Sequence, residues 1–336
     1  MSMTETRELS YVMAFNEAVR QAMEDDPDVF VAGEDVGAFG GVFGTYGGLQ
    51  KTFGAERVVD TPISEQAIVG LGVGASVTGL RPIVDLMFMD FVMVAADQIA
   101  NQAAKLKYMF GGSATVPLTI TTAGGAGLSA AAQHSQSLEA LFCHIPGIKV
   151  VYPSNPYDVK GLMSASVRDD NPTLFVLHKR MLGVRTGAVP AERYQVPLGL
   201  ANVARRGKDV TIVSWGKTAV DSLAAADLLA AERIDAEVVD LRTLSPLDID
   251  TVVASVRSTN RVVVAHEAVR FGGFGAEVAA QIQEHAFDYL DGPVGRVAAP
   301  YSPVPFTPAL ERRYVPDAEK IAAGVRAAMA RPLLGS

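Results

Sequence analysis

The stretch Asp60-Thr-Pro-Ile-Ser-Glu65-Gln66 and the apolar run after it, from Ala67 to Leu80, decide how the first half of this chain folds. The short strand Val58-Val59 is followed directly by a helix, and this strand–helix unit is the building block of an α/β fold. Glu65 is the one carboxylate at the edge of the apolar run. Burial disfavours an ionised carboxylate and raises its pKa, so an acid is costly there unless its proton is used. Glu65 is therefore the first candidate for chemistry, and aromatic rings follow the next strand in Met87-Phe-Met-Asp-Phe91.

Short apolar runs alternate with amphipathic stretches, which predicts α/β domains with mainly parallel sheets flanked by helices. Ser10 is the expected N-cap of the first helix. The Gly-rich residues 33–48 are expected to form a mobile or ligand-facing loop. In the first half we expect strands at 29–32, 58–59, 82–86, 118–121, 149–152 and 173–177, and helices at 10–23, from 64, at 90–109 and at 156–168.

The pattern is interrupted between Leu182 and Gly207, where Gly and Pro accumulate as they do in a linker. From Asp209 it restarts, with strands expected at 210–215, 236–240 and 261–266 and helices at 219–232, 248–258 and 275–287. The prediction is two α/β domains, residues 1–182 and 208–336, joined by a linker at 183–207.

Composition restricts the class of protein. The chain has 336 residues, 49% of them hydrophobic, enough for one large or two medium cores. A net charge of -8 without a dense basic cluster argues against nucleic-acid partners, and the apolar runs are too interrupted for a membrane span. The single cysteine, Cys143, excludes an internal disulfide, and the N-terminus lacks a signal-peptide pattern. We expect a cytoplasmic protein whose partners are small molecules or proteins.

The segment Gly70-Leu-Gly-Val-Gly-Ala75 can be spelled as the dinucleotide motif G-x-G-x-x-A, but its position argues against that use. In a dinucleotide site the glycines form the strand-to-helix turn, whereas here they fall inside the helix that Glu65 opens. Glycine in a helix costs about 1 kcal/mol relative to alanine, so repeated glycines favour close packing against a sheet or subunit. A nicotinamide dehydrogenase that uses these glycines is kept as an alternative.

His134 lies in the small-residue segment Ala126-Gly-Leu-Ser-Ala-Ala-Ala-Gln-His134, where a substrate could approach. A single loop histidine is more often structural than catalytic, so both interpretations stay open. The chain contains no Cys pair, H-E-x-x-H, P-loop or G-x-S-x-G. These absences argue against the common zinc sites, nucleotide-binding sites and hydrolase active sites.

Several segments carry a resemblance along nearly the whole chain. They are Gly33-Glu34-Asp35-Val36, Thr61-Pro-Ile-Ser-Glu65, Asp97-Gln98 with Asn101-Gln-Ala-Ala-Lys105, Gln133-His134-Ser135-Gln136, His144-Ile-Pro-Gly-Ile-Lys-Val-Val151, Asp240-Leu-Arg-Thr-Leu-Ser-Pro246 and His266-Glu267. In this order they resemble the β subunit of the E1 component of 2-oxo acid dehydrogenase complexes. The resemblance implies a transketolase-like pyrimidine-binding domain followed by a transketolase C-terminal-like domain that serves assembly and docking.

The resemblance implies thiamine diphosphate as the cofactor and assigns roles to four residues. Glu65 would contact the pyrimidine ring nitrogen, Phe91 would pack on the pyrimidine, and Glu34 would be a loop acid near the cofactor. His134 would be the active-site histidine that handles protons when a lipoyl group is reductively acylated. Without the resemblance, Phe91 would be assigned to core packing and Glu34 to a solvated loop.

Family members hold the diphosphate through Mg²⁺ bound by a Gly-Asp-Gly motif, which this sequence lacks. The nearest spelling, Leu290-Asp-Gly-Pro293, has no first glycine and no downstream asparagine. The resemblance therefore implies that an α subunit supplies the Mg²⁺ and diphosphate half of the site, in an α₂β₂ heterotetramer. It also implies a lipoyl-bearing acyltransferase, the E2 component, as a further partner.

The resemblance implies a structural K⁺ site as well, because hard oxygen ligands suit that ion. The matching positions are Leu118, Thr119, Ser166, Asp169 and Asn171. Asp169-Asp-Asn-Pro172 can equally be interpreted as a polar turn before a strand.

The substrate is less determined than the family. Met87 to Phe91, Lys107 to Gly112, His178-Lys179 and Ala299 to Phe306 are most similar to β subunits of acetoin dehydrogenases. We expect oxidative decarboxylation of a pyruvate-like 2-oxo acid or cleavage of acetoin, with a branched-chain 2-oxo acid as the next alternative. A mainly structural subunit that docks the acyltransferase is the alternative from another class.

Overall fold

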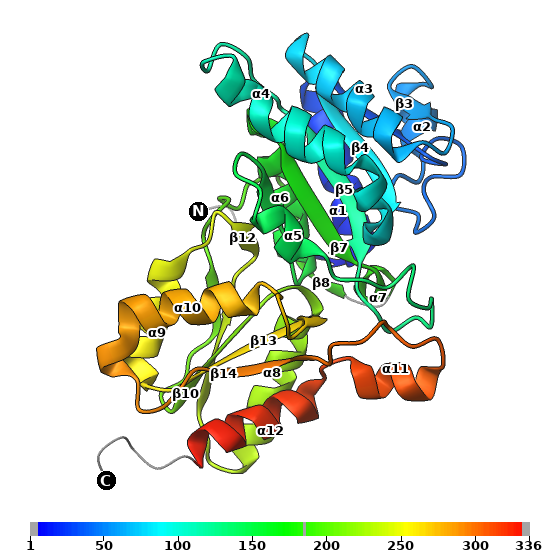
Figure 1. The fold of residues 1–336 in the computed structure, drawn as a ribbon. Coiled ribbons are helices and arrows are strands. Elements are labelled where there is room, and N and C mark those ends of the chain that lie inside the picture. The colour runs from blue at the N-terminus through cyan, green and yellow to red at the C-terminus, as the bar shows by residue number, and fades with distance from the viewer. Residues whose placement is uncertain (1–5, 184–185, 331–336) are drawn as a thin grey trace. The chain divides into compact units, whose positions relative to one another are not determined.

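The computed structural model describes residues 6–183 and 186–330, which form two compact α/β units. The first comprises residues 1–124 and 141–198, and the second comprises residues 125–140 and 199–336. Both units contain mainly parallel sheets covered by helices (Figure 1), so the predicted fold class is confirmed. Residues 184–185 of the predicted linker, and the chain ends at 1–5 and 331–336, lie outside the described residues.

The sheet of the first unit is parallel throughout the strands of that unit, in the order β6-β7-β5-β4-β2-β3. These strands are β2 (Val29–Gly33), β3 (Val58–Asp60), β4 (Arg81–Phe88), β5 (Thr119–Gly124), β6 (Lys149–Val151) and β7 (Thr173–His178). Gly33, the last residue of β2, is aligned with Asp60 of β3 and Asp85 of β4. The carboxyl ends of these three strands therefore meet at one edge.

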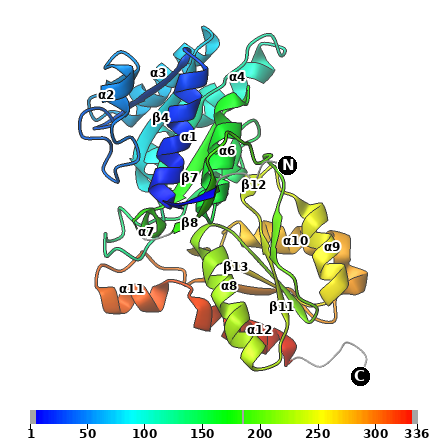
Figure 2. The same ribbon diagram turned by 180° about the vertical axis from the view of Figure 1, so that it is seen from behind.

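Helices cover both faces of this sheet. On one face α1 (Tyr11–Asp25) packs against α6 (Pro156–Arg168), as seen in Figure 2. The Ser10 hydroxyl accepts a hydrogen bond from the Met13 amide at 3.2 Å, which confirms the predicted N-cap of α1. On the other face α3 (Glu65–Val77) packs on β4, and a Cβ on Gly72 would come within 2.7 Å of the Leu118 side chain. The glycines of α3 thus allow close packing of the helix on the sheet.

The region predicted as one helix over 90–109 is divided into three parts. A 3₁₀ segment η1 (Met89–Ala95) is followed by a π-helical segment η2 (Gln98–Ala103) and by α4 (Ala104–Met109). The spacing of apolar residues predicts a helix but does not distinguish these forms. Asn101 donates a side-chain hydrogen bond to Asp97, one helical turn earlier, at 2.7 Å.

The second unit has a sheet in the order β14-β13-β10-β11-β9, parallel except for the edge strand β9. The strands are β9 (Asn202–Arg205), β10 (Val210–Ser214), β11 (Ala236–Asp240), β13 (Val262–Val269) and β14 (Gly295–Ala299). On this sheet α8 (Gly216–Ala231) packs with α12 (Ala318–Met329), and α9 (Ile249–Thr259) packs with α10 (Gly275–Ala286). The remaining helical and strand segments are β1 (Thr6–Ser10), α2 (Leu49–Phe53), α5 (Glu139–Cys143), α7 (Lys179–Leu182), β8 (Thr186–Pro190), β12 (Thr243–Ser245), η3 (Phe287–Tyr289) and α11 (Pro308–Tyr314).

The units differ from the predicted domains, 1–182 and 208–336, in two places. The predicted linker at 183–207 contributes a strand to each unit, because β8 pairs with β1 of the first unit and β9 pairs with β11 of the second. Edge strands tolerate the Gly and Pro residues that suggested a linker. In addition, residues 125–140 belong to the second unit although they follow β5 of the first. No helix in the described part of the chain is long and apolar enough to cross a membrane.

A buried acid fixes the end of segment 125–140 in the second unit. The Trp215 indole donates a hydrogen bond to Glu139 Oε1 at 3.3 Å, and the same indole stacks on the His266 ring with 5.3 Å between centroids. Burial raises the pKa of Glu139 to about 7, and the charge of Glu267 acts in the same direction while the hydrogen bonds oppose it. Glu139 is therefore a proton-binding group in the folded chain near neutral pH.

We predict that Glu139 makes the second unit less stable as the pH rises from about 4.5 to about 7. Because its pKa is higher when folded, the native state binds a proton that the unfolded state releases in this interval. The loss should be about 3 kcal/mol in the free energy of unfolding. Chemical denaturation at several pH values measures it, with the fluorescence of Trp215, the single tryptophan, as the probe. Glu139→Gln should remove this part of the pH dependence, and an unchanged pH profile in that variant would contradict the assignment.

Candidate functional site

The candidate site lies at the edge where the carboxyl ends of β2, β3 and β4 meet. Glu34 follows β2, the segment Thr61 to Glu65 follows β3, and β4 leads through Phe88 to Phe91. In open parallel sheets ligands bind outside the carboxyl ends of the strands. The first unit therefore brings three of the predicted site residues, Glu34, Glu65 and Phe91, to the same edge of one sheet.

Two carboxylates face this edge. Glu65 is the first residue of α3, where a negative charge interacts favourably with the helix dipole, and it is half-buried in this chain. Desolvation raises the pKa of Glu34, and the charges of Asp35 and Glu65 raise it further. Glu34 and Glu65 therefore lie within electrostatic range of each other. The sequence predicts an apolar setting for Glu65, and in the isolated chain the Glu65 side chain is only half-buried.

A group of aromatic rings lies beside these acids. The Phe88 ring makes edge-to-face contacts with Phe43 at 5.5 Å and with Phe91 at 5.6 Å between centroids. The ammonium group of the buried Lys179 lies 5.5 Å from the centre of the Phe88 ring. Edge-to-face pairs and a cation over a ring hold aromatic side chains in defined orientations. Phe91 is thus part of an ordered aromatic group, where a planar ring could be stacked.

The turn that carries Phe88 depends on Asp85, which the sequence did not identify. Met87 has a positive φ of 56°, unusual for a bulky side chain, and its amide donates to Asp85 Oδ1 at 2.9 Å. Asp85 Oδ2 accepts from the Tyr46 hydroxyl at 3.1 Å and from the Thr121 hydroxyl at 2.9 Å. Desolvation raises the pKa of Asp85, although these hydrogen bonds oppose the shift. The available signal was an acid inside the apolar strand 82–86.

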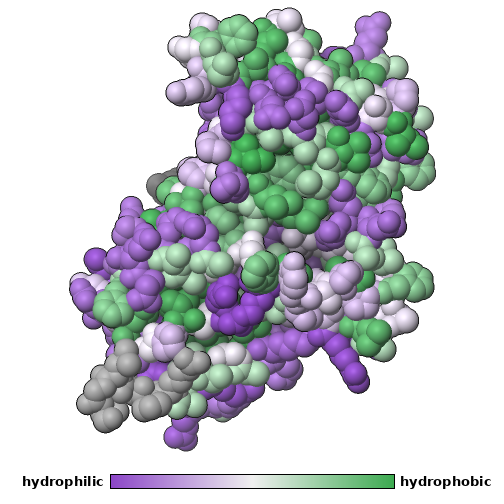
Figure 3. All heavy atoms as spheres, viewed as in Figure 1, coloured by the Kyte–Doolittle hydropathy of each residue, from purple (hydrophilic) through white to green (hydrophobic). Residues whose placement is uncertain are grey.

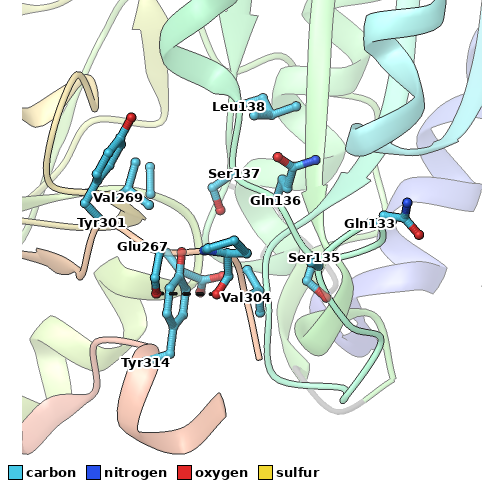
Figure 4. Close-up of a pocket in the computed structure, with 14 residues that line it drawn as sticks. Gln133, Ser135, Gln136, Ser137, Leu138, Glu267, Val269, Tyr301, Val304 and Tyr314 are labelled. Atoms are coloured by element: carbon cyan, nitrogen blue, oxygen red, sulfur yellow. Dashed lines mark hydrogen bonds between the residues drawn. The ribbon is translucent and has the colours of Figure 1, made fainter. Parts of the chain in front are cut away.

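His134, the remaining predicted catalytic residue, is half-buried in segment 125–140 of the second unit. Its neighbours Gln133 and Ser135 to Leu138 form one side of a pocket of about 580 Å³. Glu267, Val269, Tyr301, Val304 and Tyr314 contribute to the opposite side (Figure 4). A volume of this size is in the range of small-molecule sites. The second unit therefore has a ligand-sized pocket lined by the sequence neighbours of His134, whereas His134 itself does not line it.

The five predicted K⁺ positions lie at one end of the first sheet, but the side chains of Ser166, Asp169 and Asn171 already have partners. Asp169 forms an ion pair with Lys149 and accepts hydrogen bonds from the Asn171 amide groups, and Lys107 donates to Asn171 Oδ1 at 2.8 Å. The carbonyl oxygens of Leu118 and Ser166 accept from the Thr173 and Asp169 amides. Thr119 Oγ1 is buried and has no hydrogen-bond partner. A cation here would be held by the Thr119 hydroxyl and main-chain oxygens.

The dinucleotide alternative does not match the geometry of the glycines. Gly70, Gly72 and Gly74 lie inside α3 instead of in the turn after β3. Gly72 lies against Leu118 and Val84, as close packing requires.

Comparison with known proteins finds two domain families along the chain, and the first of them includes residues 125–140, which the structure groups with the second unit. The transketolase pyrimidine-binding domain family matches residues 7–184, and the transketolase C-terminal domain family matches residues 199–321. A split-gene transketolase solved as an inactive β4 tetramer has the same fold, with a TM-score of 0.77 and 26% identity over 96% of this chain and 98% of that one.

Curated relatives extend over nearly the whole chain. The β subunit of acetoin:2,6-dichlorophenolindophenol oxidoreductase from Cupriavidus necator is 49% identical over 96% of this chain and 98% of its own length. The β subunit of 2-oxoisovalerate dehydrogenase from Bacillus subtilis is 43% identical over 95% and 98%. The β subunit of the pyruvate dehydrogenase E1 component from Staphylococcus epidermidis is 42% identical over 94% and 96%. The chain therefore belongs to the E1 β subunits of the 2-oxo acid and acetoin dehydrogenases, a thiamine diphosphate-dependent family with transketolase pyrimidine-binding and C-terminal domains.

Proposed function

We propose that this chain forms the pyrimidine half of a thiamine diphosphate site in an α₂β₂ E1 component that acts on acetoin, with pyruvate as the second candidate. The observation that carries the proposal is the meeting of Glu34, Glu65 and the Phe88–Phe91 ring pair at one sheet edge. Acetoin is ranked first because the oxidoreductase named for it has 49% identity, against 42% for the pyruvate relative.

The residues at this edge suit a protonated heteroaromatic ring. The Glu65 carboxylate would share a proton with the pyrimidine ring nitrogen, and such a charge-assisted hydrogen bond strengthens when water is excluded. Phe91 would fix the plane of the ring by stacking. When bound, thiamine diphosphate supplies a ring carbon that adds to the substrate carbonyl and accepts the electron pair of the cleaved bond. Glu65 would hold the proton, and the aromatic group would orient the ring.

The surface around Glu65 supports a partner subunit that completes the site. α3 buries Ile68, Val69 and Val73 against its own sheet, yet Leu71 is 47% exposed on the opposite side. Ile63, just before the helix, is 73% exposed. Figure 3 shows such apolar side chains at the surface of the first unit. A helix that is apolar on both faces is normally buried on both, so we infer that the α subunit covers this side and supplies the Mg²⁺ and diphosphate contacts.

His134 would act in the next step, the transfer of the acyl group to a lipoyl domain of the E2 acyltransferase. An imidazole can take up and release protons near neutral pH, as the reductive acylation of a disulfide requires. Its sequence neighbours line a pocket of about 580 Å³ in the second unit, and this supports access of a ligand to the loop that carries His134.

The function is tested by co-expression of the chain with an α subunit that carries the Gly-Asp-Gly motif. We expect thiamine-dependent reduction of 2,6-dichlorophenolindophenol with acetoin, a lower rate with pyruvate and the lowest with a branched-chain 2-oxo acid. The purified β chain alone should neither turn over these substrates nor bind thiamine diphosphate in calorimetry. Turnover by the β chain alone would contradict the divided site, and a dominant rate with pyruvate would replace acetoin as the substrate.

Glu65→Gln should abolish most of this activity without loss of assembly. The amide keeps the size of the side chain but cannot share a proton as a carboxylate does, so we expect kcat to fall by about 100-fold or more. Steady-state kinetics of the reconstituted tetramer measure the loss. Glu56→Gln, at an exposed acid of the same unit, is the matched control. Retention of more than half of the activity by Glu65→Gln would exclude the role given to Glu65.

The K⁺ site is also kept as a proposal, with Thr119 Oγ1 and main-chain oxygens as ligands. We expect the melting temperature of the tetramer to be higher by about 2 °C in KCl than in NaCl at equal ionic strength, because binding to the native state stabilises it. Thr119→Val removes the unpaired hydroxyl while keeping the shape of the side chain, and should abolish the difference between the salts. Equal melting temperatures of the unchanged protein in both salts would rule out a K⁺-specific site.

A further inference from the structure

The loop that carries His134 is held by acids from distant parts of the second unit. This loop, residues 125–136, is closed at its base because the Gly125 amide donates to the Gln136 carbonyl at 3.3 Å. Loops with joined ends form compact surface structures whose shape depends on what they enclose or contact. The shape of this loop therefore sets where the His134 side chain points.

The loop backbone is strained. Ser129 and Ala131 have positive φ values of 54° and 62°, and both carry a Cβ that disfavours this region. Gly127 has a φ of 102°, which glycine adopts without a side-chain clash. Left-handed residues other than glycine are unfavourable, so contacts from outside the loop must maintain the conformation.

Those contacts come from Glu311 of α11. Glu311 Oε1 accepts the Gly127 amide at 2.7 Å, and Oε2 accepts the Ser129 amide at 2.9 Å and the Ser129 hydroxyl at 3.3 Å. The Glu311 side chain is buried, so these charge-assisted bonds form with little competition from water. Glu267 adds a bond at the start of the loop, from the Ala126 amide at 2.5 Å. The strained Ser129 and the neighbouring Gly127 are thus fixed by one buried carboxylate.

We propose that Glu311 is a positioning residue for His134 in acyl transfer to the lipoyl group, an inference that rests on the proposed function. Glu311 reaches His134 only through the loop backbone. Its loss would let Ser129 relax from the left-handed region and displace the histidine. Displacement of a reacting group by about 1 Å can cost on the order of 100-fold in rate. Cleavage of acetoin at the pyrimidine edge does not use His134, so only the transfer step should suffer.

The experiment compares the two half-reactions in the reconstituted α₂β₂ complex carrying Glu311→Gln. We expect acylation of an isolated lipoyl domain to slow by at least about tenfold, whereas dye-coupled acetoin oxidation should change by less than about twofold. Glu284→Gln, at an exposed acid of the same unit, should leave both rates unchanged. Equal loss of both reactions, or unchanged acylation, would overturn the proposal.

Hydrogen exchange keeps the proposal testable if Glu311→Gln fails to assemble. In the unchanged complex the Gly127 and Ser129 amides should be protected, because each donates to the buried carboxylate. In a variant that folds, exchange should rise in peptides covering 125–136 and not elsewhere in the second unit. Unprotected amides in the unchanged complex would overturn the proposal without any variant. A complex without dye-coupled activity would instead refute the proposed function.

Discussion

Parallel pairing of β2, β3 and β4 is the constraint on which the candidate site depends. In a parallel sheet successive strands leave at the same edge, so Glu34, Glu65 and Phe91, separated in sequence by whole helices, are delivered to one place. The pairing also requires close approach. A Cβ on Gly33 would lie 2.9 Å from the Asp85 carbonyl oxygen, and one on Gly72 would overlap the Leu118 side chain. These glycines allow the close packing that aligns the strand ends. This packing requirement explains why the sequence matches a dinucleotide motif at a place where no strand-to-helix turn exists.

Carboxylates that accept main-chain amides have a common use in both units. Asp85 accepts the amide of Met87, and Glu311 accepts the amides of Gly127 and Ser129, in each case at a backbone with at least one positive φ. An unpaired buried carboxylate would be strongly destabilising, and a turn with bulky residues at positive φ would relax without a partner. Each feature compensates for the other. The main-chain amides donate hydrogen bonds to the carboxylate, and the carboxylate holds the turn in its conformation. In both units the fixed turn is the one that presents side chains with a proposed function, the Phe88–Phe91 pair or His134.

Local sequence patterns predicted the helices, strands and caps that depend on residues close together in the sequence. The buried strands, the Ser10 cap and the helix begun at Glu65 follow from periodicity and capping chemistry, and the structure confirms them. The features that local patterns do not predict depend on hydrogen bonds between residues far apart in the sequence. Ala126 and Glu267 are separated by 141 positions, and Gly127 and Glu311 by 184. No periodicity links such pairs, so the assignment of residues 125–140 to the second unit could not be predicted. The short strands β8 and β9 have the Gly and Pro content of a linker, and their pairing partners lie elsewhere in the chain, so the local sequence predicts a linker there.

The incomplete burial of Glu65 follows from the same packing. α3 is apolar on the side that packs on its sheet and also on the side that carries the exposed Leu71. The sequence of α3 therefore suits two interfaces, and this chain forms one of them. A carboxylate at the start of such a helix changes its environment when the second interface forms, because water is removed from it at that moment. Glu65, half-buried in the isolated chain, would then become in the proposed complex the acid in an apolar setting that the sequence indicated. The α subunit would thus complete the proton-sharing environment of Glu65 as well as the diphosphate contacts, which couples assembly of the complex to activation of the cofactor.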